Sequence, residues 1–269
     1  MHKQFFLFIC LILSLVSLTT YAKDTEFPGR AKFPNIPVYE LRQLSQGLAD
    51  VVVVDARSRY EYETLRFKGS INIPVASKTF EQELIQLRSK TNKPIVFYCN
   101  GRTCFKSYIA VKKGQAAGVS NIFAFDAGVF EWAIAKPKYA VLLGESPIKK
   151  EHLISVKKFN SHLLHHDSFS DKAFDLGSNS MVLDVRDKYQ RAGIGFYPGK
   201  ERWVSLDDTK KLDKMLAKAK KKNKTLFIYD EVGKQVKWLQ YTIEKQGIKN
   251  YYFMKKGATA YYTAIMERK

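Results

Sequence analysis

Two cysteines in the stretch PIVFYCNGRTCFKS, residues 94–107, are the side chains of this chain best suited to covalent chemistry. Cys99 ends an apolar run that begins at Pro94, and Cys104 follows five positions later. A cysteine thiolate is both a nucleophile and a metal ligand. The pair therefore fits four uses: a structural disulfide, a redox pair, part of a metal site, or a nucleophile held in a cradle.

Length and composition indicate a folded protein with room for more than one domain. The chain has 269 residues, of which 45% are hydrophobic, and this suffices for two domains of roughly 100–150 residues each. The formal net charge of +19 favours anionic partners, which include small oxyanions, nucleic acid and anionic lipid headgroups.

The N-terminal segment predicts export. Lys3 precedes an apolar core over 5–18 that is too short to span a bilayer comfortably, and Ala22 is a small residue suited to signal peptidase. We expect residues 1–22 to be a cleaved signal peptide, and the mature protein to be periplasmic or secreted without stable membrane insertion. An uncleaved N-terminal anchor is the alternative. Export argues against nucleic acid as the anionic partner, and it leaves Cys99 and Cys104 where disulfides persist.

Three segments of the first half recur in the same order, at near-constant spacing, in the second half. VVVDARSRYE (52–61) matches MVLDVRDKYQ (181–190), PIVFYCNG (94–101) matches TLFIYDEV (225–232), and NIFAFDAGVFEWAIA (121–135) matches NYYFMKKGATAYYTA (250–264). The matches predict two tandem copies of one fold, with a period too long and copies too few for a solenoid.

Short continuous apolar strands alternate with amphipathic helices in each copy. The helix predicted over 209–224, for example, has an apolar face that begins at Leu212, and its lysines form the solvated face. Such alternation is typical of a mostly parallel sheet covered on both faces. The predicted fold class is therefore α/β, with domains over 34–140 and 151–269. A linker is predicted over 141–150, which carries proline and glycine and lacks helical periodicity.

Cys99 is expected at the carboxyl end of a buried strand, the edge at which open parallel sheets bind ligands. The loop after it opens a helix, so that backbone N–H groups and the positive end of the helix dipole face the sulfur and stabilise a thiolate. Arg102 and Lys106 add positive charge that we expect to hold an anionic substrate. The predicted active loop consists of Asn100, Gly101, Arg102, Thr103, Cys104, Phe105 and Lys106, with Cys99 as the catalytic nucleophile.

These motifs resemble those of rhodanese domains, the sulfurtransferases that carry sulfane sulfur as a cysteine persulfide. VVVVDARSRYEYETLRFKGSINIPVA (51–76) and FAFDAGVFEWAIAKP (123–137) are similar to the family's opening and closing signatures. The residues that carry the resemblance are Asp55, Arg57, Glu61, Gly69, Ile71, Pro74, Gly128 and Trp132. The resemblance covers nearly all of the predicted mature chain. It implies that Cys99 takes sulfur from a donor such as thiosulfate and passes it to a thiophilic acceptor.

The sequence departs from the family's pattern in the cysteine loop, at Lys68, where the family usually has a histidine, and in the second copy. Ser107 lies eight positions after Cys99, so the loop is longer than the usual one, and the added length holds Cys104. In the second copy Asp230 stands where the cysteine is expected, and a carboxylate cannot form a persulfide. The resemblance therefore implies that the copy over 151–269 is catalytically silent and shapes a cleft or binds a partner.

Structural interpretations stand beside the catalytic ones. Two cysteines lack the further ligands of a closed zinc site, and a disulfide across so short a loop gains little chain entropy. The stretch HLLHHD has histidines at helical spacing, His162 and His166 among them, that suit either a metal on a helix face or a surface feature. Asp55 and Arg57 are expected to form a buried pair, and Trp132 to lie in the core.

The sequence thus predicts an exported sulfurtransferase of the thiosulfate sulfurtransferase type, with no cofactor and no metal. Its expected partners are a small anionic sulfur donor and a thiol or cyanide-like acceptor, with a protein sulfur acceptor as a further option. Two other functions remain open: a thiol-disulfide redox protein that uses Cys99 and Cys104 together, and a non-catalytic sulfur carrier or binding module.

Overall fold

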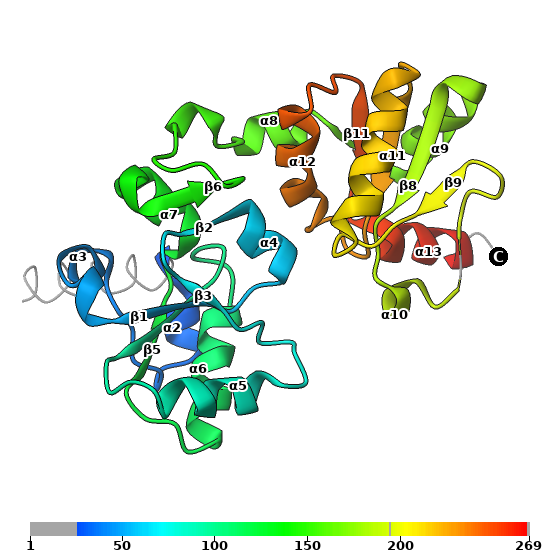
Figure 1. The fold of residues 1–269 in the computed structure, drawn as a ribbon. Helices are drawn as coiled ribbons and strands as arrows, with labels where there is room; N and C mark the ends of the chain where they lie inside the picture. Colours follow the sequence, from blue (N-terminus) through cyan, green and yellow to red (C-terminus); the bar gives the residue numbers. More distant parts are fainter. Residues whose placement is uncertain (1–25, 194, 268–269) are drawn as a thin grey trace, which may run out of the picture. The chain divides into compact units, whose positions relative to one another are not determined.

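The computed structural model describes residues 26–193 and 195–267, and the predicted signal peptide over 1–22 lies outside them. The chain divides into two compact units, one within residues 1–150 and one within 151–269, each of which is described by itself (Figure 1). In the described ranges, no helix is long and apolar enough to cross a membrane.

A parallel sheet of four strands organises the first unit. The strands of this unit are β1 (Val52–Asp55), β2 (Leu65–Phe67), β3 (Ile71–Asn72), β4 (Ile95–Tyr98), β5 (Ile122–Phe125) and β6 (Ala140–Leu142). The order in the sheet is β3-β1-β4-β5, and an isolated parallel bridge from Val38 to Ala124 continues it beyond β5. β2 and β6 form a separate antiparallel pair.

Helices and the β2/β6 pair cover the two faces of this sheet. The helices are α2 (Pro28–Lys32), α3 (Leu41–Gln46), α4 (Arg59–Thr64), α5 (Phe80–Arg88), α6 (Lys106–Ala116) and α7 (Gly128–Ala135). One core joins α5 and α6 to the sheet through Phe80, Tyr108 and Phe97. A second aromatic cluster joins α7 to β2, where Trp132 stacks on Phe67 with ring centroids 4.4 Å apart. Trp132 is fully buried, so its predicted place in the core is confirmed.

The second unit has a sheet of five parallel strands in the order β7-β11-β10-β8-β9. These strands are β7 (Leu163–Leu164), β8 (Ser180–Asp184), β9 (Glu201–Trp203), β10 (Thr225–Tyr229) and β11 (Tyr251–Met254). The three sequence matches fall on β1 and β8, β4 and β10, and β5 and β11. Register agrees as well: Asp55 lies opposite Tyr98 in the first sheet, and Asp184 lies opposite Tyr229 in the second.

The helices of the second unit are α8 (Val156–Asn160), α9 (His166–Asp175), α10 (Lys188–Arg191), α11 (Thr209–Lys221), α12 (Val236–Lys245) and α13 (Gly257–Glu267). α9 and α13 share one core with the sheet, in which Phe169 and Ala258 contact Phe227 and its neighbours. α11 buries Leu212 and Leu216, as the sequence predicted, and its lysines remain exposed. The α/β fold with parallel sheets flanked by helices is thus confirmed.

The structure differs from the sequence prediction where the first unit ends. Residues 140–142, which overlap the first two positions of the linker expected over 141–150, form β6, and all three are buried against β2. This apolar run is short, and Gly144 and Pro147 follow it. It is therefore too short to show the periodic pattern of apolar residues by which a strand is recognised.

An ion pair is buried where β1 ends, as the sequence predicted for Asp55 and Arg57. The Arg57 Nε lies 2.9 Å from Asp55 Oδ1 and its Nη2 lies 2.6 Å from Oδ2, and both side chains are fully buried. Arg57 also donates to the Leu65 carbonyl at 2.5 Å and to Asn100 Oδ1 at 3.2 Å. The pair therefore ties β1 to β2 and to the loop after Cys99.

Asp55→Ala should destabilise the first unit strongly, because it leaves the Arg57 guanidinium buried without its carboxylate. We expect a loss of about 3–5 kcal/mol, measured as a shift of the first unit's transition in urea unfolding. Glu63→Ala is the matched control, since Glu63 pairs with Arg59 on the surface. It should cost less than about 1 kcal/mol. Equal effects of the two substitutions would contradict a structural role for the buried pair.

Candidate functional site

The predicted active loop lies between β4 and α6, at the carboxyl edge of the first sheet. Cys99 is the first residue after β4 and is fully buried. Its carbonyl accepts a hydrogen bond from the Val129 amide at 2.9 Å, which fixes the strand end against the start of α7. Thr103 is exposed at the tip, and Phe105 packs on the core beside Phe33, with ring centroids 5.9 Å apart.

Gly128 permits the closest approach within this site. Its φ of +72° lies in the left-handed region, and a side chain there would collide with the backbone of Gly101. Gly118 makes a useful comparison, because it also has a positive φ, of +78°, but has open space around it. The glycine at 128 is thus required by contact with the loop as well as by its own backbone conformation.

Burial and its contacts favour the protonated form of the Cys99 thiol. Its Sγ donates to the Cys104 carbonyl at 2.9 Å and lies 3.6 Å from Ser107 Oγ. Burial raises the pKa of Cys99 well above its usual value, and the neighbouring Cys104 raises it further. The sequence predicted the opposite direction for this pKa, because it placed the loop amides around Cys99 and gave no weight to the cost of burying a charge.

Cys104 is the cysteine whose thiolate the loop stabilises. The Cys99 side chain, backbone N–H groups of Lys106 and Asn100 and the Lys106 charge lower the pKa of Cys104 to about 6 against the opposing effect of burial. Cys104 is also partly exposed, whereas Cys99 is not. Both cysteines are free, and the direction of the pKa shifts favours the thiolate at the more accessible Cys104.

Carboxylates of the first unit neutralise both cations that were expected to hold substrate. Arg102 makes a two-pronged contact with Glu131, with its Nε at 2.5 Å from Oε1 and its Nη2 at 3.0 Å from Oε2, and it also pairs with Glu26. Lys106 Nζ lies 3.1 Å from Glu61 Oε2. These cations therefore hold the loop in shape and offer less charge to a substrate than the sequence suggested.

Glu61 connects the loop to the end of β1. It is buried and accepts from Asn100 Nδ2 at 3.1 Å as well as from Lys106. Burial alone would raise the pKa of Glu61, but Lys106, Arg57 and Asn100 together lower it, so that the carboxylate stays charged. Glu61 belongs to the opening signature of the family resemblance, so a role near the loop could have been predicted for it. Nothing in the sequence indicated a role for Glu131, because its contact with Arg102 is formed only in the folded chain.

The corresponding loop of the second unit holds a carboxylate. Asp230 directly follows β10, and its side chain accepts from the backbone N–H groups of Gly233, of Gln235 at 2.5 Å and of Val236 at 3.1 Å. The Ala258 amide donates to the Asp230 carbonyl at 2.8 Å, as the Val129 amide does to Cys99. Burial raises the pKa of Asp230, and the loop N–H groups oppose this shift.

His162 and His166 do not share a helix face, which excludes the first of the two interpretations that the sequence allowed for them. His162 lies in a turn before β7, where its ring stacks on Tyr251 at 4.0 Å, while His166 begins α9. The β7 strand between them breaks the helical spacing that the sequence suggested. In the described part of the chain, His165, His166 and Asp167 do place ligand atoms within 4.8 Å of one another. This trio is distant in sequence from the cysteine loop.

Comparisons with known proteins identify the first unit. Residues 38–135 match the family described as the rhodanese-like domain. An HTH-type transcriptional regulator of Mycobacterium tuberculosis is 34% identical over 86 residues, which cover 32% of this chain and 36% of that protein. A tRNA uridine(34) hydroxylase of Salmonella paratyphi B is 33% identical over 89 residues, which cover 31% of this chain and 24% of that protein.

Among solved structures, a thiosulfate sulfurtransferase from Pseudomonas aeruginosa is 18% identical with a TM-score of 0.35, covering 88% of this chain and 46% of that one. An As/Sb reductase from Leishmania major is 18% identical with a TM-score of 0.36, covering 47% of this chain and 97% of that one. The chain matches 36% or less of the length of the curated relatives named above. The match to the rhodanese-like domain is confined to residues 38–135 and lies within the first unit.

Proposed function

We propose that this chain is an exported sulfurtransferase in which Cys104 takes up sulfane sulfur and Cys99 carries it as a persulfide. The observation that carries the proposal is the pairing, in the loop after β4, of a buried free cysteine, Cys99, with a more accessible one, Cys104, whose carbonyl lies 2.9 Å from Cys99 Sγ. The rhodanese-like match over 38–135 is consistent with sulfur transfer. Residues 1–22 support export from their sequence alone.

The first step uses the thiolate that is accessible near neutral pH. The Cys104 sulfur attacks the outer sulfur of an anionic donor such as thiosulfate. A sulfur–sulfur bond forms as the donor's own sulfur–sulfur bond breaks, and sulfite leaves with the electron pair. The low pKa of Cys104 supplies the thiolate without a histidine base.

The second step moves the sulfur inward. Cys99 attacks the outer sulfur of the Cys104 persulfide while its thiol proton passes to Cys104, so that one thiol and one persulfide exist before and after. An acceptor thiolate or cyanide then attacks the outer sulfur on Cys99 and releases the Cys99 sulfur, which regains a proton. The hydrogen bond of 2.9 Å from Cys99 Sγ to the Cys104 carbonyl holds the two residues close together and supports a direct exchange of this kind.

Asp230 occupies in the second unit the position that Cys99 occupies in the first, and this supports Cys99 as the residue that carries the persulfide anion. A carboxylate oxygen of aspartate lies two bonds from Cβ, as does the outer sulfur of a cysteine persulfide. Asp230 therefore resembles a persulfide in shape and charge, and the loop N–H groups of the second unit bind it. By this analogy the second unit is a silent rhodanese-like copy that retains the anion cradle and has lost the reactive sulfur.

Incubation with thiosulfate followed by intact-mass measurement and peptide mapping tests the relay. Wild-type protein should gain one sulfur, found on Cys99 and removed by cyanide. Cys104→Ser should load at least about tenfold more slowly at neutral pH, because the remaining thiol is protonated. Cys99→Ser should hold its sulfur on Cys104. Loading of Cys104→Ser at the wild-type rate would exclude the relay, and no loading by any sulfane donor would exclude sulfur transfer.

The pH dependence of alkylation should separate the two thiols. Thiolate forms as pH rises through the pKa, so Cys104 should react with iodoacetamide along a curve with its midpoint at about 6. Cys104→Ser should leave only Cys99, whose reaction should begin well above the range of an ordinary thiol. Peptide mapping of partly labelled wild-type protein assigns each label. A Cys99 midpoint below that of Cys104 would reverse the assignment.

Gly128→Ala should impair sulfur loading by roughly tenfold or more, because the new Cβ displaces the backbone of Gly101 and with it the loop amides. Gly118→Ala is the matched control, since it imposes the same strained backbone conformation without touching the loop. Urea unfolding should show both variants folded. Equal loading by the two variants would show that the contact at Gly128 does not shape the site.

Thiol–disulfide exchange by the same pair is a second candidate function, favoured by the presence of two free, hydrogen-bonded cysteines. In that reaction the Cys104 thiolate attacks a substrate disulfide and releases one thiol. Cys99 then resolves the mixed disulfide, releasing the second thiol and leaving a Cys99–Cys104 bond. Turnover of a small disulfide substrate requires both cysteines and an external thiol that reduces the Cys99–Cys104 bond after each cycle, and without that thiol the reaction stops at an intraloop disulfide with no added sulfur.

A further inference from the structure

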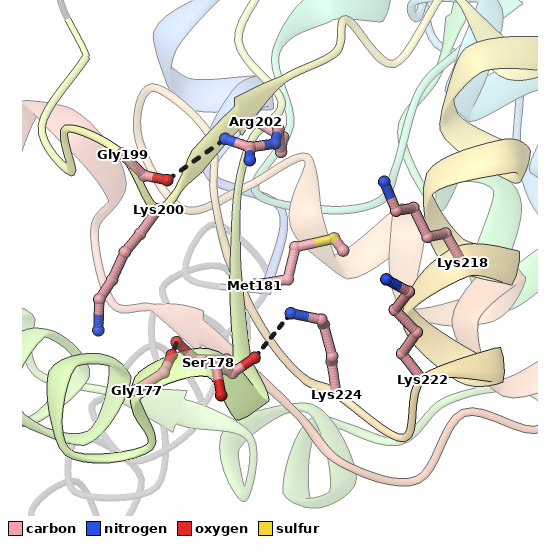
Figure 2. Close-up of a pocket in the computed structure, with 10 residues that line it drawn as sticks. Gly177, Ser178, Met181, Gly199, Lys200, Arg202, Lys218, Lys222 and Lys224 are labelled. Carbon is pink, nitrogen blue, oxygen red and sulfur yellow. Dashed lines mark hydrogen bonds between the residues drawn. The ribbon is translucent and has the colours of Figure 1, made fainter.

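Five cationic side chains line a cavity of about 280 Å³ in the second unit (Figure 2). They are Lys200, Arg202, Lys218, Lys222 and Lys224. The other residues that line it are glycines, serines and Met181, so no carboxylate lies among the described residues of its wall. We refer to this cavity as the basic pocket.

The basic pocket lies at the amino ends of three parallel strands. Ser180 begins β8, Lys200 directly precedes β9, and Lys224 directly precedes β10. Asp230 follows β10 at the carboxyl end of the same sheet, so the pocket and the Asp230 loop occupy opposite edges. The pocket is therefore separate from the position at which this fold presents its loop residue.

Backbone carbonyls, which carry no net charge, hold three of the five cations. Lys224 Nζ donates to the Ser178 carbonyl at 2.7 Å, and Arg202 Nη1 donates to the Glu201 carbonyl at 2.8 Å. Lys200 Nζ lies 3.2 Å from both the Ala173 and the Phe174 carbonyl. These contacts orient the three side chains and leave their positive charge uncompensated.

The remaining two cations extend into the pocket from α11 and its C-terminal end. Figure 2 shows Lys218 and Lys222 side by side, one helical turn apart, with neither ammonium group joined to another drawn residue. Neither has an ion pair or side-chain hydrogen bond to any residue of 26–193 or 195–267. Two like charges so close on one helix repel each other, and an anion placed between them relieves that repulsion.

The contrast with the cysteine loop identifies the kind of ligand. Arg102 and Lys106 are each paired with a carboxylate, whereas the cations of the basic pocket have no carboxylate partner among the described residues. Four of the five are lysines, which bind phosphate oxygens as point charges, whereas planar carboxylates are matched best by arginine. A cavity of this size admits a small compact anion and excludes a folded peptide segment.

We propose that the basic pocket binds a compact, multiply charged phosphate chain of the triphosphate type. Lys218 and Lys222 contact its oxygens directly from one side, and Arg202 and Lys224 supply fixed charge from the strand side. The same chemistry is offered by a free inorganic chain and by the end of a larger phosphorylated molecule. The binding experiment compares these two sources.

Isothermal titration of the full chain with inorganic tripolyphosphate, at near-physiological salt, tests the proposal. The double variant Lys218→Gln/Lys222→Gln should weaken binding by roughly tenfold or more, since each removes a charge-assisted contact. Lys210→Gln/Lys214→Gln is the matched control, because it removes two lysines at the same spacing on the same helix but outside the pocket. Its affinity should stay close to that of the wild type.

Three results would overturn the proposal: no heat of binding by wild-type protein, equal loss in the two double variants, or tighter binding of polyglutamate than of tripolyphosphate. Equal loss would mean that the anion responds only to the general charge of the surface. Titration with adenosine triphosphate then separates the sources. Binding as tight as that of tripolyphosphate assigns the pocket to a terminal phosphate chain, and much weaker binding assigns it to the free ion.

Discussion

Backbone N–H groups that converge in a loop require acceptors, and this requirement organises the cysteine-bearing edge of the first unit and its counterpart in the second. A buried amide without an acceptor costs about 1–3 kcal/mol, and an anion among several inward-directed amides satisfies them together. In the first unit the loop amides lower the pKa of Cys104 and so favour its thiolate. In the second unit the Asp230 carboxylate accepts from the loop amides. The chemistry of each unit follows from which anion its own sequence supplies.

Much of the fold could be predicted from the sequence because it repeats. Matching segments place three strands of each sheet, and the observed registers of Asp55 with Tyr98 and of Asp184 with Tyr229 agree with that alignment. The strand-end position of Cys99 followed from the apolar run before it. β6 could not be predicted, since three residues carry no period and depend on a partner strand far away in the chain.

The electrostatics of the site could not be predicted in the same way. Local sequence shows that Arg102 and Lys106 are positive, but their partners Glu131 and Glu61 come from other elements. The two cysteines look alike in sequence, and only their different burial and hydrogen bonds separate a thiol from a thiolate. The basic pocket is assembled from the starts of three strands and one helix end, so no single segment of sequence contains it.

Gly128 and Gly257 have the same positive φ conformation, and in both a side chain would collide with the loop opposite. Each unit thus shapes its loop through main-chain contact that is independent of the residue at the strand end. Such a scaffold tolerates substitution of the residue at the strand end. Exchange of cysteine and aspartate there changes which reactions the side chain can take part in, while the backbone around it is retained. Two units built in this way can differ in chemistry at the strand end while they keep the same fold.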